Sequence, residues 1–176
     1  MKRVDGFGAT NAKLMIIGIA PSYEEVNQGK PFVGPSGFLL REDLHDANYD
    51  LDKCYRTNIF KYQLPNNEFQ KHQEIGLSLD LALAELKQEI DTINPNCILG
   101  LGDPVLYALT GKKGKGNNIN VWRGSILEVF GSRKAVFTWH PAHELHGTGE
   151  GTFKSWQKYV RKFDVNRAVD ESLLPT

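Results

Sequence analysis

Three side chains able to hold a flat polar ring stand in separate loops of this sequence. Phe32 lies between a proline and a glycine, an unusual setting for a core residue. Asn58 offers an amide donor and an amide acceptor together. His140 follows the apolar run Ala135–Trp139 and precedes a proline that pins its loop. Each also has an ordinary explanation: Phe32 as a core residue, Asn58 as a turn residue bonded to its own backbone, and His140 as a structural histidine.

Charged residues add two further features. The sequence from Lys112 to Lys134 holds six basic residues and one acid, and we expect either a solvated surface or a patch facing phosphates. His143 and His146 have a spacing compatible with a metal ligand pair, but no third ligand accompanies them. We therefore expect no metal and no other cofactor.

The elements that must position these residues alternate between strand and helix. Short apolar runs predict strands, and periodic patterns predict helices with apolar faces at Phe38, Leu39, Leu40 and Leu44, at Leu79, Leu83, Leu86 and Ile90, and at Trp156, Val160 and Phe163. The expected strands are 13–18, 54–60, 96–102, 125–130 and 135–139; the expected helices are 36–47 (capped by Ser36), 78–94, one from Asp103, and 153–169. This alternation predicts a parallel sheet covered on both faces. Ligands bind beyond the carboxyl ends of such strands, where the loops Gly18–Gly37, Asn58–Asn67 and His140–Gly147 lie.

The bulk composition sets limits on the class of protein. A chain of 176 residues with 40% apolar residues fits a single domain spanning residues 1–176. Two cysteines, Cys54 and Cys97, fit a reducing compartment and cannot supply a four-thiolate cluster. No signal peptide and no run of about 20 apolar residues is evident. We expect a cytoplasmic monomer that does not bind membranes.

Several segments, taken in order, resemble the family-4 uracil-DNA glycosylases. That family has Gly-Glu-Ala-Pro-Gly, an acid and Pro-Phe-Val-Gly in its first motif, then Thr-Asn-x-x-Lys, a Pro-x-x-Ile-x-x-Leu-Gly strand, Arg-Gly and His-Pro-Ala. The corresponding segments here are Gly18–Gly37, Thr57–Lys61, Pro95–Gly102, Arg123–Gly124 and His140–Ala142. Any one match is weak, but five in the same order form a specific pattern covering most of the chain.

The resemblance implies a three-layer α/β/α sandwich around a four-stranded parallel sheet, with DNA, single- or double-stranded, as the partner. A base flipped from DNA would stack on Phe32, meet Asn58 at its edge, and leave with a hydrogen bond from His140 to its O2. Gly18, Ile19, Ala20 and Ser22 of the first motif would complete the base pocket. Phosphate contacts are expected from Ser36, Lys61 and Arg123, and an apolar wedge into the duplex from Leu145, beside the unfavourable charge of Glu144.

The sequence departs from the family at the residue that activates water. The family's glutamate is replaced by Ile19, and Ala20 follows, which makes this stretch similar to the family-5 branch. Three alternatives follow: leaving-group stabilisation by His140 and Asn58 suffices, Glu25 or its neighbour Glu24 supplies the carboxylate, or the protein recognises a base without cleaving it or cleaves a different, modified base. The small Ser22 would not bar a 5-substituted pyrimidine. A nucleotide-binding α/β protein is the remaining alternative, supported by Gly100-Leu101-Gly102 alone.

Overall fold

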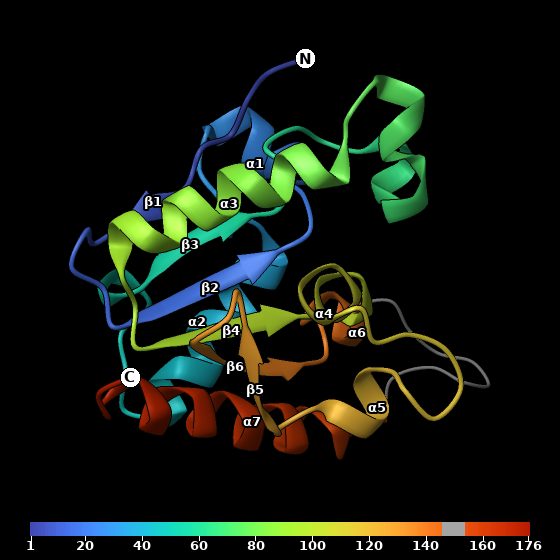
Figure 1. Ribbon diagram of the computed structural model, residues 1–176. Helices are drawn as coiled ribbons and strands as arrows, with labels where there is room; N and C mark the ends of the chain where they lie inside the picture. Colours follow the sequence, from blue (N-terminus) through green and yellow to red (C-terminus); the bar gives the residue numbers. More distant parts are fainter. Residues whose placement is uncertain (146–153) are drawn as a thin grey trace.

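The computed structural model describes residues 1–145 and 154–176 and contains a six-stranded sheet in the order β1-β3-β2-β4-β6-β5 (Figure 1). Its four central strands are mutually parallel: β3 (Tyr55–Asn58), β2 (Leu14–Gly18), β4 (Cys97–Leu101) and β6 (Arg133–Thr138). The short β1 (Phe7–Gly8) and β5 (Ile126–Val129) pair antiparallel at the two edges. The expected α/β fold is confirmed, with antiparallel strands added on both sides of the parallel centre.

Helices cover both faces of this sheet. Figure 1 shows α3 (Leu79–Ile93) across one face and α2 (Pro35–Asp46) with α7 (Gln157–Ser172) across the other. A helix that follows β4, α4 (Asp103–Thr110), packs into the same apolar cluster as α3. The remaining helices are short: α1 (Tyr23–Gln28), α5 (Ile119–Trp122), α6 (Ala142–Leu145) and the 3₁₀ helices Leu51–Lys53, Pro65–Asn67 and Phe69–Ile75. No helix within the two described ranges is long and apolar enough to cross a membrane.

The two innermost strands, β2 and β4, carry no charged or polar side chains apart from a cysteine, because both of their faces are buried. In β2, Met15 and Ile17 pack in the cluster under α3, whereas Leu14 and Ile16 pack in the cluster under α2 and α7. Successive side chains of a strand point to opposite faces, so a strand between two helical layers needs apolar residues at every position.

The local signals predicted α3 well and α2 less well. The hydroxyl of Ser78 accepts the N–H of Leu81 at 3.4 Å at the start of α3, and Asn94, just before Pro95, ends the helix with a φ of 54°. For α2 the predicted cap was wrong: Gly34 is the N-cap, and Pro35 occupies the first helical position. Leu40 and Leu44 face the core as expected, but Phe38 is 65% exposed.

The predicted apolar face of the last helix was wrong at two of its three residues, since only Val160 packs against the core. Trp156 is 56% exposed and Phe163 is 79% exposed, while α7 buries Arg161 and Asp164 beside Val165. These buried charges have partners from distant elements, so they replace apolar residues in the interface. The expected start of this helix at Phe153 lies outside the described residues.

Candidate functional site

The three expected loops converge on one cavity of about 510 Å³ at the carboxyl ends of the parallel strands. Its walls come from residues 19–36, from Asn58 and Asn67, from residues 101–104 and 119, and from residues 139–145. Phe32, Asn58 and His140 all line it. The part of the third loop that follows Leu145 lies outside the described residues.

Gly18 allows two of these residues to meet. It ends β2 directly opposite Asn58 of β3. A methyl group added at Gly18 would stand 2.5 Å from Asn58 Oδ1 and 2.8 Å from Phe32 Cζ, distances at which atoms must shift. The absence of a side chain at Gly18 therefore lets the Asn58 amide and the edge of the Phe32 ring approach each other.

Phe32 is held in a strained backbone conformation by Glu25. Its φ of 55° lies in the left-handed region, which costs on the order of 1–3 kcal/mol for a residue with a large side chain. The Glu25 carboxylate, 7% exposed, accepts the N–H of Phe32 at 2.8 Å through Oε1. Its Oε2 accepts the N–H and the hydroxyl of Ser22, at 2.6 and 2.7 Å, which caps α1. Glu25 thus ties the start of α1 to the Phe32 loop.

The Phe32 side chain is both a core residue and a wall of the cavity. It is 4% exposed and packs in the apolar cluster that contains Leu40 and Leu44, yet it lines the cavity with Asn58. Gly37 lies so close that an added methyl group would stand 2.0 Å from the Phe32 carbonyl oxygen. Phe32 is therefore a core residue whose ring also borders the cavity.

The buried side chain of Lys61 binds the backbone of Asn58. The Lys61 side chain is 4% exposed, and its Nζ donates to the Asn58 carbonyl oxygen at 2.8 Å, to Thr57 Oγ1 at 2.6 Å and to Glu89 Oε2 at 2.6 Å. An ammonium group has three N–H bonds, and all three have partners here. These contacts do not favour the expected phosphate contact, because none of the donors points to solvent; they favour a role in fixing Asn58.

His140 enters the cavity with a defined ring orientation. Its Nδ1 accepts the backbone N–H of Ala142 at 3.0 Å. A neutral imidazole with an accepting Nδ1 carries its proton on Nε2, which makes Nε2 the donor. Gly102, which follows β4 and has a φ of 91°, lies close to His140: a methyl group added at Gly102 would stand 3.4 Å from His140 Cβ.

The Arg123-Gly124 pair is explained by a buried carboxylate of α7. Arg123 donates through two nitrogens to Asp164, with Nε at 2.8 Å, and an added methyl group at Gly124 would stand 2.6 Å from Asp164 Oδ1. The same guanidinium lies over the Trp139 ring, 5.3 Å from its centroid. Arg123 thus packs on Trp139, which forms part of the cavity wall. Because two of its nitrogens are bonded to Asp164, fewer N–H groups of Arg123 are left for the expected phosphate contact.

Comparison with known protein families decides the membership of the chain. The family model described as the uracil DNA glycosylase superfamily matches residues 6–164. The chain belongs to the uracil DNA glycosylase superfamily.

Relatives within this superfamily carry more specific names. A type-4 uracil-DNA glycosylase of Thermotoga maritima is 32% identical over 143 residues, covering 81% of this chain and 71% of the relative. The type-4 uracil-DNA glycosylase of Archaeoglobus fulgidus is 29% identical over 154 residues, covering 81% and 72%. A DNA polymerase of Bacillus phage SP01 is 33% identical over 141 residues, covering 80% of this chain and 14% of the polymerase.

The resemblance to family 4 predicts an acid in the first motif, where this sequence has Ile19 and Ala20. Ile19 and Ala20, which replace the expected acid, line the cavity together with Ser22. Ser36, in the first turn of α2, and Leu145, 46% exposed in α6, also line it, as needed for their expected contacts with DNA. These positions are compatible with their expected roles and do not test them.

Glu144 does not face the cavity mouth as an unpaired charge. Arg161 Nη2 donates to Glu144 Oε2 at 2.8 Å, and the same guanidinium pairs with the buried Asp43, with Nε at 2.6 Å from Oδ2. The network joins α6, α7 and α2. The expected repulsion between Glu144 and phosphates is therefore reduced, because its charge is paired.

Two further residues line the cavity, Asp103 and Trp139, and neither was predicted from the sequence as a site residue. Asp103 follows β4 directly, and its Oδ1 accepts the N–H of Ile119 at 2.8 Å. Trp139 follows β6, and its Nε1 donates to Asn120 Oδ1 at 2.8 Å. Their place at the carboxyl ends of two central strands was the available signal, since ligands of such sheets bind there.

The residues present do not fit a four-thiolate metal cluster. The 176 residues contain two cysteines, and both are buried in the apolar cluster under α2 and α7. Burial raises the pKa of the Cys54 and Cys97 thiols to about 12, whereas a metal ligand must be a thiolate. No group of three or more candidate metal ligands occurs among the described residues. His146, which has a ligand-like spacing from His143 in the sequence, lies outside them.

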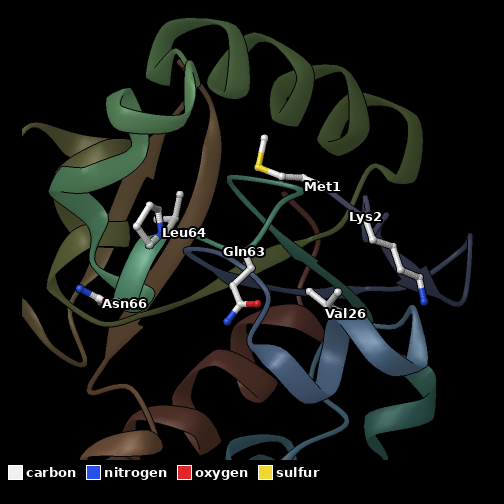
Figure 2. Close-up of a pocket in the computed structure, with 7 residues that line it drawn as sticks. Met1, Lys2, Val26, Gln63, Leu64 and Asn66 are labelled. Atoms are coloured by element: carbon white, nitrogen blue, oxygen red, sulfur yellow. The ribbon is translucent and has the colours of Figure 1, made fainter.

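A second cavity, of about 370 Å³, lies between the N-terminal segment and the loop that follows β3 (Figure 2). Its walls include Met1, Lys2, Val26 and Gln63, and the Lys2 ammonium donates to the backbone oxygen of Asn27 at 3.2 Å. The described residues that line it contribute neither a carboxylate nor an imidazole. Its chemistry therefore does not compete with that of the first cavity.

Proposed function

We propose that this chain is a DNA glycosylase that binds uracil or a related pyrimidine flipped out of DNA and hydrolyses its N-glycosidic bond. The observation that carries the proposal is the meeting of Phe32, Asn58 and His140 around one cavity, from the loop after β2, the end of β3 and the segment after β6. The names of the type-4 relatives support the same class of reaction. The cavity volume lies within the usual range for small-molecule sites.

The three residues would divide recognition and catalysis between them. Phe32 stacks on the base, which is worth about 1–3 kcal/mol and offsets part of the cost of flipping. The Asn58 amide hydrogen-bonds the base edge. When the C1′–N1 bond breaks, its electron pair moves to the base, and His140 Nε2–H donates to O2 as negative charge develops there. Water oxygen bonds to C1′, and its proton is lost to solvent or to the base.

Glu25 enters this proposal as the support of Phe32. Three hydrogen bonds already engage its two carboxylate oxygens, so orienting water would be a second task for the same group. Ile19 and Ala20 contribute no acid, and we propose that stabilisation of the leaving base carries most of the rate. Asp103 is the other carboxylate that lines the described part of the cavity.

A second candidate is a base-binding protein without catalysis. The observation that favours it is the apolar character of Ile19 and Ala20 at the place where the family carries an acid. The nucleotide-binding alternative loses its support, since an added methyl group at Gly100 would stand 2.5 Å from the Phe137 ring, so packing already requires that glycine.

An assay of base removal separates these candidates. Labelled single- and double-stranded oligonucleotides that contain uracil, hydroxymethyluracil or thymine are incubated with the protein and tested for alkali-labile sites. The proposal predicts cleavage that falls about a hundredfold or more in Asn58→Ala and in His140→Ala. Binding without alkali-labile sites would favour the second candidate. Asp103→Asn and Glu25→Gln, compared at equal folded fraction, test whether either carboxylate contributes.

A further inference from the structure

Three aromatic side chains near the N-terminal end of α7 are largely exposed to solvent and form a stripe. Trp156, Tyr159 and Phe163 are 56%, 65% and 79% exposed. Spacings of three and four residues place them on one side of the helix. The opposite side of α7 packs on the sheet through Val165, Ala168 and Val169. Neighbouring exposed apolar side chains of this size mark an interaction surface.

The sequence around this stripe is basic, and the neighbouring helix α2 brings the acids Asp43 and Asp46 against two of its basic residues. From Lys154 to Phe163 the sequence contains four basic residues and no aspartate or glutamate. Arg161 is buried on Asp43, and Lys162 pairs with Asp46. Lys154 and Lys158 form no ion pair with any residue in the described ranges, and Lys158 Nζ lies 5.2 Å from the Tyr159 ring centroid. We call Lys154, Trp156, Lys158, Tyr159 and Phe163 the α7 strip.

The α7 strip is continuous with the candidate site. The Trp156 ring packs edge-on against Trp139, with centroids 6.1 Å apart and planes at 71°, and Trp139 lines the cavity. Figure 1 shows α7 beginning beside α5 and running back beneath the sheet to the C-terminus. The C-terminal end of α7 is fixed at the amino end of β4, where Asn96 Nδ2 donates to the Ser172 carbonyl oxygen at 2.8 Å. The strip therefore leads away from the cavity wall.

We propose that the α7 strip binds an unpaired stretch of the DNA strand that carries the flipped nucleotide. This inference rests on the proposed function. Exposed aromatic faces accept bases of any sequence by stacking, and lysines accept the phosphates between them. The seven residue-to-residue steps from Trp156 to Phe163 rise about 10 Å, the length of roughly three stacked bases.

Charge argues against a second copy of this chain as the occupant. A symmetric contact would bring the Lys154 and Lys158 side chains of one strip against those of another, which is unfavourable. A base-paired duplex offers no free base faces to Tyr159 and Phe163, because its bases are already stacked and paired. A single strand satisfies both the aromatic residues and the lysines.

The test measures binding of a 15-nucleotide single strand without uracil, by fluorescence anisotropy, so that it does not depend on catalysis. We expect Tyr159→Ala with Phe163→Ala to weaken binding at least tenfold, and Lys158→Gln to weaken it and reduce its salt dependence. Leu81→Ala, which removes another exposed apolar side chain on the opposite layer, and Lys13→Gln, at the start of β2, are matched controls and should bind like wild type.

Kinetics complete the test. On a uracil-containing 15-mer the double variant should raise KM at least tenfold with kcat unchanged, and on a trinucleotide too short to reach the strip it should match wild type. Three outcomes would overturn the inference. The double variant could bind as well as wild type, or the two control variants could lose as much binding. Sedimentation could also show a wild-type dimer that the double variant abolishes. If the wild-type protein releases base but the double variant binds the single strand equally well, the α7 strip proposal fails and the proposed function stands. If the double variant binds more weakly but the wild-type protein releases no base, the proposed function fails and the α7 strip proposal stands.

Discussion

The Glu25 carboxylate accepts the backbone N–H of Phe32 at 2.8 Å while also capping α1 through Ser22. One side chain thus fixes both the start of a helix and the left-handed backbone of the residue proposed to stack on the base. The relationship gives a carboxylate of the first motif a task other than water activation.

Glu25→Gln should therefore reduce stability as well as activity. A glutamine amide must direct its NH₂ group at one of the N–H donors that Glu25 now accepts, which leaves a buried donor unsatisfied and costs about 1–3 kcal/mol. We expect a lower midpoint in urea denaturation together with a lower kcat/KM. Loss of kcat with an unchanged midpoint would instead assign Glu25 to water activation.

Gly18→Ala tests the contact between the amide and the ring. The new methyl group would stand within 3 Å of both Asn58 Oδ1 and Phe32 Cζ, so both must move. A displacement near 1 Å in a catalytic group lowers activity about a hundredfold, and the overpacking costs about 1–3 kcal/mol. Single-turnover rates and thermal melts measure the two effects. Wild-type kinetics in this variant would contradict the close approach.

Lys61→Met tests whether this lysine positions Asn58 or contacts phosphate. Removing the ammonium leaves Glu89 unpaired in a largely buried site, and we expect a loss of about 3 kcal/mol in the free energy of unfolding. The double variant Lys61→Met with Glu89→Gln should recover part of that loss. A phosphate contact predicts the opposite result: unchanged stability and a slope of log KM against log salt smaller by about 1.

Alkaline pH should destabilise the protein through its two buried thiols. The folded protein holds both protons to about pH 12, whereas an unfolded thiol loses its proton near pH 8.5. The stabilisation is therefore complete below about pH 8.5 and declines as the pH rises, by up to about 1.4 kcal/mol per pH unit for each thiol. Urea denaturation between pH 8 and 10 measures the slope. Cys54→Ala with Cys97→Ala should remove most of it; an identical slope would contradict the assignment.

The sequence predicted the parallel centre of the sheet because its signal is local. Strands β2 and β4 are buried on both faces, so both are apolar runs; β2 ends in Gly18 and β4 ends in Leu101. The same reasoning placed Phe32, Asn58 and His140 at strand ends, where the structure brings them to one cavity. Helix α1 was missed although Ser22 and Glu25 have the spacing of a capping box, because the prolines and glycines around it suggested a loop.

Buried charges account for the errors that periodicity produced. Arg161 and Asp164 occupy the inner side of α7, which left Trp156 and Phe163 to suggest an apolar face that in fact points outward. The partners that make such burial possible, Asp43 and Arg123, lie far away in the sequence. The partner of Lys61, Glu89, is also distant in the sequence, so no local pattern predicts that pair. Pairing across the fold cannot be inferred from a local pattern.

The most direct test of the central claim is the amount of free base released in a single turnover. Excess protein is mixed with an oligonucleotide that contains one uracil, and free base and abasic sites are both quantified by mass spectrometry. The account predicts one free base for each abasic site, at a rate lowered at least a hundredfold in folded Asn58→Ala and His140→Ala variants. Tight binding of the oligonucleotide with no free base, or release unaffected by both substitutions, would contradict it.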